Sequence, residues 1–224
     1  GDSAVQNLTR EELDAIENLG KLLDKEDAAT KLREQIPLSL DSKDIKSASL
    51  QKDNIEEDKY IWEISFDKLY GSVDARTGEL LNYRYYGDDT EGKRDLTKEA
   101  AKKIAESFLQ KVSPQKFSES RYIPDYAEYI IYTREEEKPA TYSFRYNRLV
   151  NGVEFVDNGL SVTVNRTTGD ITWYNNNWYD KAVFPSLADV ITDVEMMEEM
   201  VKEYSFDVAY ERTGKSRDAD LVYT

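Results

Sequence analysis

The sequence contains neither cysteine nor histidine in its 224 residues. Without these side chains it has no disulfide, no thiol nucleophile, no histidine-based catalytic triad, and none of the cysteine and histidine ligands typical of structural zinc and haem. It also lacks any apolar run of the ~18 residues that a membrane-spanning helix needs. We therefore expect a protein that is not an enzyme, holds no metal or cofactor, and does not insert into a membrane.

Basic residues are scarce as well. The chain has 30 Lys and Arg against 45 Asp and Glu, a formal net charge of −15. This charge repels DNA, RNA and anionic lipid, which bind surfaces rich in Lys and Arg, so no nucleic-acid partner is expected. The acidic composition suggests a basic protein partner, although the same charge can serve solubility alone. The sequence leaves the oligomeric state open.

Three similar helix starts organise the chain. Helices are predicted from Thr9, Thr97 and Thr192, each followed by an acidic residue and then by apolar residues at helical spacing. A further short helix is expected within 27–40. The methionines after Thr192 are interpreted as core residues; they are Met196, Met197 and Met200.

A region rich in β-branched and aromatic residues follows each of the first two helices. Such residues, bounded by Gly, Asn and Asp, are typical of antiparallel strands joined by tight turns. The expected strands and hairpins lie at 60–66, 71–83, 126–133, 142–150 and 161–174, with a turn at Asn151 and Gly152.

The two predicted hairpins at 71–83 and 161–174 have matching turns, 77–79 and 168–170, that lie 91 residues apart. Asp74 and Asn165 can accept N–H groups of the residues that follow them, and the glycine of each turn can adopt positive φ. Calcium at Asp74 and Glu79 is an alternative, but the spacing of an EF-hand is missing. The turn interpretation is preferred.

These elements predict an α+β protein made of tandem repeats, each a helix packed on an antiparallel sheet. The expected repeats are 1–91, 92–183 and a partial third at 184–224 that stops before a hairpin, with the first boundary at the charged segment 87–93. A helix that covers one face of such a sheet leaves the other face to solvent or a partner.

The segments 73–80, 96–109, 164–171 and 184–197 resemble the PepSY-like repeats of the YcdB/YcdC type. The resemblance implies an extracellular or cell-surface protein. It also implies a link to secreted peptidases, because PepSY-like domains occur in their propeptides and a role in holding peptidases inactive has been proposed. These motifs are signatures of a fold and contain no reactive residue.

Other features are compatible with catalysis but have ordinary structural explanations. Two Ser-x-x-Lys matches start at Ser49 and Ser113; the first falls in an expected strand and the second in a proline turn, without the Lys-Thr-Gly strand of penicillin-binding enzymes. Two acidic clusters, 56–58 and 135–137, are typical of solvated turns. A pair of carboxylates could still serve a hydrolase.

An aromatic segment near 173–179 is the candidate for partner binding. On a strand, Trp173, Asn175 and Asn177 would face one way, and the residues between them the other. Exposed aromatic rings beside asparagine suit a peptide or glycan partner, whereas the alternative is packing against the helix near Thr192 or a facing sheet. The candidate partner-binding residues are Trp173, Tyr174, Trp178 and Tyr179.

The function expected from these observations is a non-enzymatic extracytoplasmic protein-binding module. Its partner would be a secreted peptidase or wall hydrolase, which it would inhibit or regulate. The alternatives are a carboxylate-dependent wall hydrolase and a structural spacer in a surface protein.

Overall fold

The computed structural model describes residues 20, 22–38, 44–56, 58–87, 95–124, 139–188 and 190–203, together with the backbone at 208–211 and 220–223. The chain divides into two compact units, residues 1–182 and residues 183–224. The helix expected from Thr9, the strand expected at 126–133, the acidic cluster at 135–137 and most of the boundary at 87–93 lie outside the described residues. No described helix is long and apolar enough to cross a membrane.

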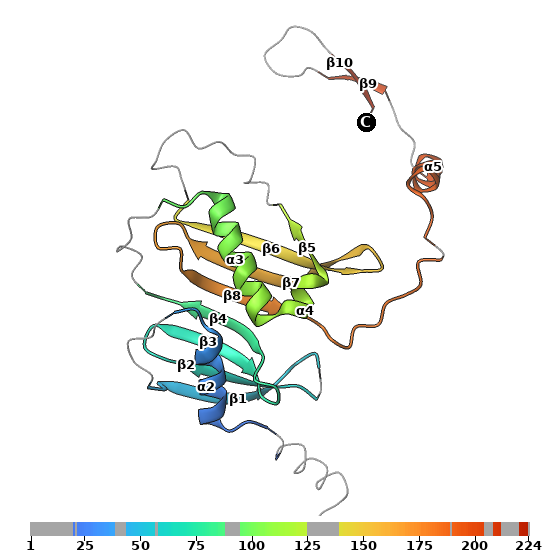
Figure 1. The fold of residues 1–224 in the computed structure, drawn as a ribbon. Coiled ribbons are helices and arrows are strands. Elements are labelled where there is room, and N and C mark those ends of the chain that lie inside the picture. Colours follow the sequence, from blue (N-terminus) through green and yellow to red (C-terminus); the bar gives the residue numbers. More distant parts are fainter. Residues whose placement is uncertain are drawn as a thin grey trace, which may run out of the picture. The chain divides into compact units, whose positions relative to one another are not determined.

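One antiparallel sheet of eight strands forms the framework of the first unit (Figure 1). The strand order is β1-β2-β3-β4-β8-β7-β6-β5, so β4 and β8, from different halves of the unit, are neighbours. This sheet is larger than the one expected for a single repeat. The strands are β1 (Ser47–Lys52), β2 (Tyr60–Ser65), β3 (Leu69–Asp74), β4 (Leu80–Tyr85), β5 (Ser120–Ile123), β6 (Thr141–Val150), β7 (Val153–Asn165) and β8 (Ile171–Asn177).

Three helices lie on the same face of this sheet: α2 (Lys25–Gln35), α3 (Lys98–Val112) and the short α4 (Pro114–Ser118) (Figure 1). The helix predicted from Thr97 is confirmed as α3, whose first turn is capped by the Thr97 side chain, 3.2 Å from the N–H of Ala100. The short helix expected before Pro37 is α2, which begins two residues before the expected segment because Asp24 caps it, accepting from the N–H of Asp27 at 2.8 Å.

The core between helices and sheet is apolar and aromatic. Tyr83 and Tyr174 are register partners on β4 and β8, both fully buried, with ring centroids 6.4 Å apart. Phe108 of α3 meets both rings edge-on. Each hydroxyl is satisfied: Tyr83 donates to the carbonyl of Ile171, and Tyr174 shares a 2.9 Å hydrogen bond with Ser113. The two halves thus share one core.

The two predicted hairpin turns are confirmed and have the same local structure. Asp74 Oδ1 accepts from the N–H of Arg76 and of Thr77, and Asn165 Oδ1 accepts from the corresponding two N–H groups of its own turn. Gly78 and Gly169 have φ of 73° and 81°. The same Asp74 oxygen also accepts from the Thr77 hydroxyl, and no group of three or more acidic side chains among the described residues could hold a metal.

The second unit contains α5 (Asp193–Glu203) and an antiparallel pair, β9 (Val208–Glu211) and β10 (Asp220–Tyr223). The capping box predicted at Thr192 is confirmed, since Thr192 and Glu195 exchange hydrogen bonds. Two expectations were wrong. The strand pair follows the helix where no hairpin was expected, and the three methionines of α5 are 48–66% exposed rather than in the core.

Candidate binding surface

The face of the sheet opposite the helices carries a continuous row of mostly polar side chains. Successive register partners connect all eight strands, and every member of the row lies on this face, which we call the open face. Its middle positions are uncharged amides and hydroxyls. From β1 to β5 the row is Ser49, Glu63, Ser72, Asn82, Asn175, Ser161, Arg145 and Ile123.

A parallel row beside it holds the aromatic residues of the open face. Tyr70 on β3 is opposite Arg84 on β4, and Arg84 is opposite Trp173 on β8. Tyr86, two residues beyond Arg84, is 61% exposed and lies under the guanidinium of Arg84 at 5.9 Å. Tyrosine, tryptophan and arginine therefore gather where the two halves of the sheet meet.

A small hollow of about 200 Å³ adjoins Trp173. It is lined by residues of β6, β7 and β8, together with the end of β5. The guanidinium-bearing Arg145 and two hydroxyl side chains supply its polar groups. Its lining residues are Ile123, Pro124, Ser143, Phe144, Arg145, Ser161 and Trp173.

Two arginines of the open face have no carboxylate partner among the described residues. Neither Arg84 nor Arg145 forms an ion pair there, although both are exposed. Two other arginines are paired: Arg121 lies 3.2 Å from Glu154 and Arg166 lies 3.5 Å from Asp95. Among the described residues, two guanidinium groups without a carboxylate partner thus lie near Trp173 in a strongly acidic chain.

The structure separates the four aromatic residues proposed from the sequence. The predicted alternation of β8 places Trp173 on the open face and Tyr174 on the helix side, where it is fully buried. Trp178 is 5% exposed and is covered by the Arg148 guanidinium at 4.7 Å, while the Tyr179 ring packs near Phe155. The helix that packs on Tyr174 is α3, through Phe108.

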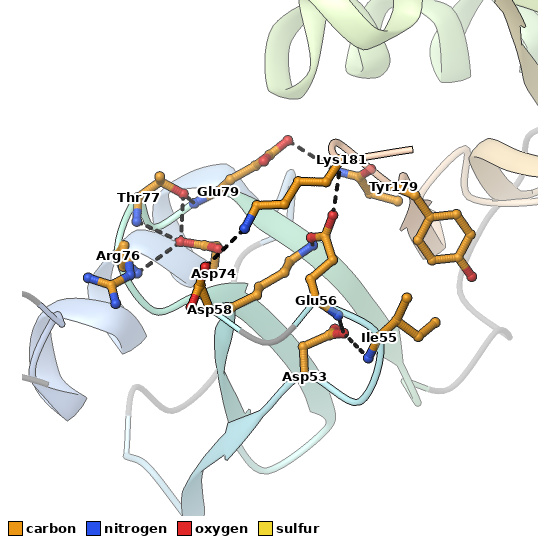
Figure 2. Close-up of polar contacts among 12 residues, drawn as sticks. Asp53, Ile55, Glu56, Asp58, Asp74, Arg76, Thr77, Glu79, Tyr179 and Lys181 are labelled. Carbon is orange, nitrogen blue, oxygen red and sulfur yellow. Dashed lines mark hydrogen bonds and ion pairs between the residues drawn. The ribbon is translucent and has the colours of Figure 1, made fainter. Parts of the chain in front are cut away.

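Glu56 and Asp58, the described carboxylates of the cluster at 56–58, join the two halves of the first unit. Glu56 pairs with Lys59 at 3.3 Å and accepts from the backbone N–H of Lys181, whose Nζ lies 3.2 Å from Asp58 (Figure 2). Asp53 caps the same turn by accepting from the N–H of Ile55 and of Glu56 (Figure 2). These carboxylates have structural partners.

Neither Ser-x-x-Lys match forms a nucleophile pair. Ser49 lies on the edge strand β1, exposed, as expected. Ser113 precedes α4 and bonds the buried hydroxyl of Tyr174, whereas Lys116 pairs with Glu79 at 2.6 Å. Ser113 and Lys116 therefore form hydrogen bonds with different groups and not with each other.

Glu79 is the central polar contact between the halves on the helix side. Glu79 directly precedes β4, and its carboxylate accepts hydrogen bonds from both Lys116 Nζ and Asn176 Nδ2. The lysine side chain is only 14% exposed, so its charge depends on this partner. We expect Glu79→Gln to cost about 1–3 kcal/mol of unfolding free energy, measured by chemical denaturation.

Asp170 provides the matched control for this substitution. It occupies the corresponding turn position, 91 residues later, and forms no ion pair among the described residues. Asp170→Asn is expected to cost clearly less than Glu79→Gln. Equal losses would mean that the pairing with Lys116 does not stabilise the junction.

The fold and the open face define an α+β protein with helices on one face of an antiparallel sheet. Among solved structures it is similar to the Bacillus megaterium YpeB C-terminal domain, with 13% identity, a TM-score of 0.54, and coverage of 90% of this chain and 86% of that one. At this identity the similarity concerns the fold alone. No protein with a curated function matches the chain significantly.

The family is shown by sequence. The model of the YcdB/YcdC repeated domain matches residues 25–178, so the chain belongs to that family. This confirms the resemblance carried by 73–80, 96–109 and 164–171; the fourth segment, 184–197, lies beyond the matched region.

Proposed function

We propose that this chain is a non-enzymatic, extracytoplasmic protein-binding module that contacts its partner through the open face of the sheet. One observation carries the proposal: Trp173 lies half-buried on the sheet face opposite the helices, next to the exposed Arg84 and beside a hollow containing Arg145. Residues that dominate protein interfaces are enriched in Trp, Tyr and Arg and cluster at the centre of the contact.

The surroundings of this cluster also suit a protein interface. Rings and guanidinium groups at the junction of β4 and β8 are flanked by amide and hydroxyl side chains, such as Asn82, Asn175 and Thr163. An aromatic centre with a polar rim excludes water from the strongest contacts while keeping the free protein soluble. A spacer would not require such a grouping.

We also infer that the first unit consists of two repeats related by a two-fold axis through the centre of the sheet. Tyr83 and Tyr174 are 91 residues apart in sequence and are register partners. The Asp74 and Asn165 turns share this spacing, as do the carbonyls of Ala75 and Arg166, which accept from the residue two positions before each helix. The open face is then a single binding surface to which both repeats contribute strands.

A secreted peptidase or wall hydrolase is the partner class suggested by the PepSY-like resemblance, with inhibition or regulation as the outcome of binding. The chain lacks His and Cys, and the carboxylates Glu56, Asp58 and Glu79 have structural partners. These features support binding rather than hydrolysis. A hydrolytic activity that survives purification and disappears when one carboxylate is replaced would contradict the non-enzymatic part of the proposal.

Affinity capture from secreted and wall-extract fractions of the source organism tests the binding proposal. Wild type, Trp173→Ser and a control, Val153→Ser, are immobilised in parallel; Val153 is 52% exposed beside the Asn151 turn. We expect one protein to be retained by wild type and control but not by Trp173→Ser. With the purified partner, loss of Trp173 should weaken binding ~30-fold, the effect of a 2 kcal/mol hot spot.

The result that would overturn this proposal is equal retention by wild type and Trp173→Ser, which would place binding elsewhere. No retained protein from either fraction would favour the spacer alternative. Circular dichroism of each variant is the folding control: a variant that keeps the wild-type spectrum but loses the partner has lost binding without unfolding.

A further inference from the structure

We infer that the partner presents an acidic segment, and that one of its carboxylates is held by Arg145 in the hollow beside Trp173. This inference rests on the proposed function and names the chemistry of the partner at the same site. Composition alone suggests a basic partner, because the net charge is −15. The local charge of the open face favours the opposite.

Arg145 is separated from the carboxylate of the polar row along the open face. Arg84 is on β4 and Arg145 on β6, on either side of Trp173. The carboxylate of the same polar row, Glu63, lies on β2, five strands from Arg145, which is ~24 Å at the usual strand spacing. Glu63 also accepts from Gln51 Nε2 at 2.7 Å. Arg145 is therefore far from this carboxylate, whereas Arg84 on β4 is two strands from it, ~10 Å at the same spacing.

The hollow has the size and chemistry to hold an acidic side chain. Its volume of about 200 Å³ is below the ~300–1,000 Å³ typical of small-molecule pockets, so it fits one side chain better than a cofactor. A guanidinium binds a carboxylate with two parallel N–H···O bonds. The hydroxyl of Ser161 adds a further donor at the wall of the hollow, beside Ser143, which shares a 2.9 Å hydrogen bond with Thr163. The Trp173 ring gives the same segment an apolar contact.

A short acidic segment fits the chain as a whole better than a polyanion. A nucleic acid or long polyuronate would bring many charges within reach of a protein with net charge −15, and repulsion would grow with length. A segment with one or two carboxylates at Arg84 and Arg145 gains local attraction, while most of its length meets uncharged side chains such as Asn175.

A random-dodecapeptide display selection tests this inference without a known partner. The full chain is immobilised, and the library is first depleted on Trp173→Ser, so that enriched peptides depend on Trp173. We expect them to carry more Asp and Glu than the starting library. Replacing their acidic residues by Asn or Gln should weaken binding at least tenfold by titration calorimetry.

Arg145→Gln should cause a similar loss, and it should add little to the loss caused by neutralising the peptide, because both remove the same contact. Arg76→Gln is the charge-matched control, located in the turn after β3 (Figure 2). It should leave the affinity within twofold of wild type.

The outcomes separate this inference from the function on which it rests. Trp173-dependent peptides without an acidic excess, or binding insensitive to Arg145→Gln, would overturn the acidic-segment inference and leave the open face as a protein-binding surface. A selection that yields no Trp173-dependent peptide would count against both. Acidic peptides lost equally in Arg145→Gln and Arg76→Gln would indicate general charge attraction and overturn the assignment to the hollow.

Discussion

Raising the pH above about 10 is expected to unfold the first unit over a narrow range, because three tyrosines are buried in its core. Tyr83 and Tyr174 are 0% exposed and Tyr146 is 2% exposed. Burial raises the pKa of all three hydroxyls above that of free tyrosine, and the nearby Glu106 carboxylate raises the pKa of Tyr146 further. The unfolded chain therefore loses these protons at lower pH than the folded protein does.

The sign and size of the effect follow from proton linkage. Below pH ~10 these tyrosines are neutral in both states, so their contribution is constant. Above that pH the folded protein keeps protons that the unfolded chain releases, and each group lowers the unfolding free energy by about 1.4 kcal/mol per pH unit. Three groups give about 4 kcal/mol per unit, which removes a stability of ~5–10 kcal/mol within one to three pH units.

Circular dichroism and phenolate absorbance, followed together through an alkaline titration, check this prediction. The buried phenolates should appear only as the fold is lost. The double variant Tyr83→Phe with Tyr174→Phe lacks two of these hydroxyls and should show a slope smaller by about 2.7 kcal/mol per pH unit. Tyr86→Phe, at a site 61% exposed, leaves the three buried hydroxyls in place and should keep the wild-type slope. Ionisation of all tyrosines before unfolding would contradict it.

Local features of the fold could be predicted from the sequence because their causes lie within a few residues. The Asp74 and Asn165 turns require a side-chain acceptor and a glycine at fixed offsets. The start of α3 needs only Thr97 and the apolar spacing after it. The alternation of β8 correctly separated Trp173 from Tyr174.

The joining of two halves into one sheet could not be predicted in this way. It depends on pairing between β4 and β8, which are distant in sequence and carry no turn that specifies their register. One signal was present: Tyr83 and Tyr174 occupy equivalent positions in the 91-residue pattern. Equivalent residues can meet at a two-fold axis, but only the strand order shows that they do.

The candidate site could be predicted only in part, because it too depends on pairing between strands that are distant in sequence. Trp173 stood out as an aromatic residue on an alternating strand, whereas Arg84 and Arg145 come from other strands and looked like ordinary surface residues. Only cross-strand register places Arg84 directly opposite Trp173 and Arg145 beside the hollow. Trp178 and Tyr179 were grouped with Trp173 by sequence proximity, which does not predict a shared face beyond the end of a strand.

Replacing Gly159 by alanine is expected to be among the most damaging single substitutions in the sheet. An added Cβ would lie 2.0 Å from the carbonyl oxygen of Tyr146 and 2.9 Å from Cα of Asn147, both main-chain atoms of β6. Gly159 pairs with Asn147 on one side and with Asn177 on the other, so it sits inside the sheet. Main chain cannot rotate away as a side chain can. Strands β6 and β7 must therefore separate.

We expect Gly159→Ala to lower the unfolding free energy by about 3 kcal/mol or more, at or above the upper end of ordinary overpacking. Gly152→Ala is the control, because its φ is +81° but an added Cβ meets nothing within 4 Å. Gly152→Ala should lower the unfolding free energy by about 1 kcal/mol, because an alanine is strained in the left-handed backbone conformation. Urea denaturation of both variants measures the difference. Similar losses would show that β6 and β7 accommodate a Cβ at Gly159, and that this close strand contact does not limit the stability of the second half of the sheet.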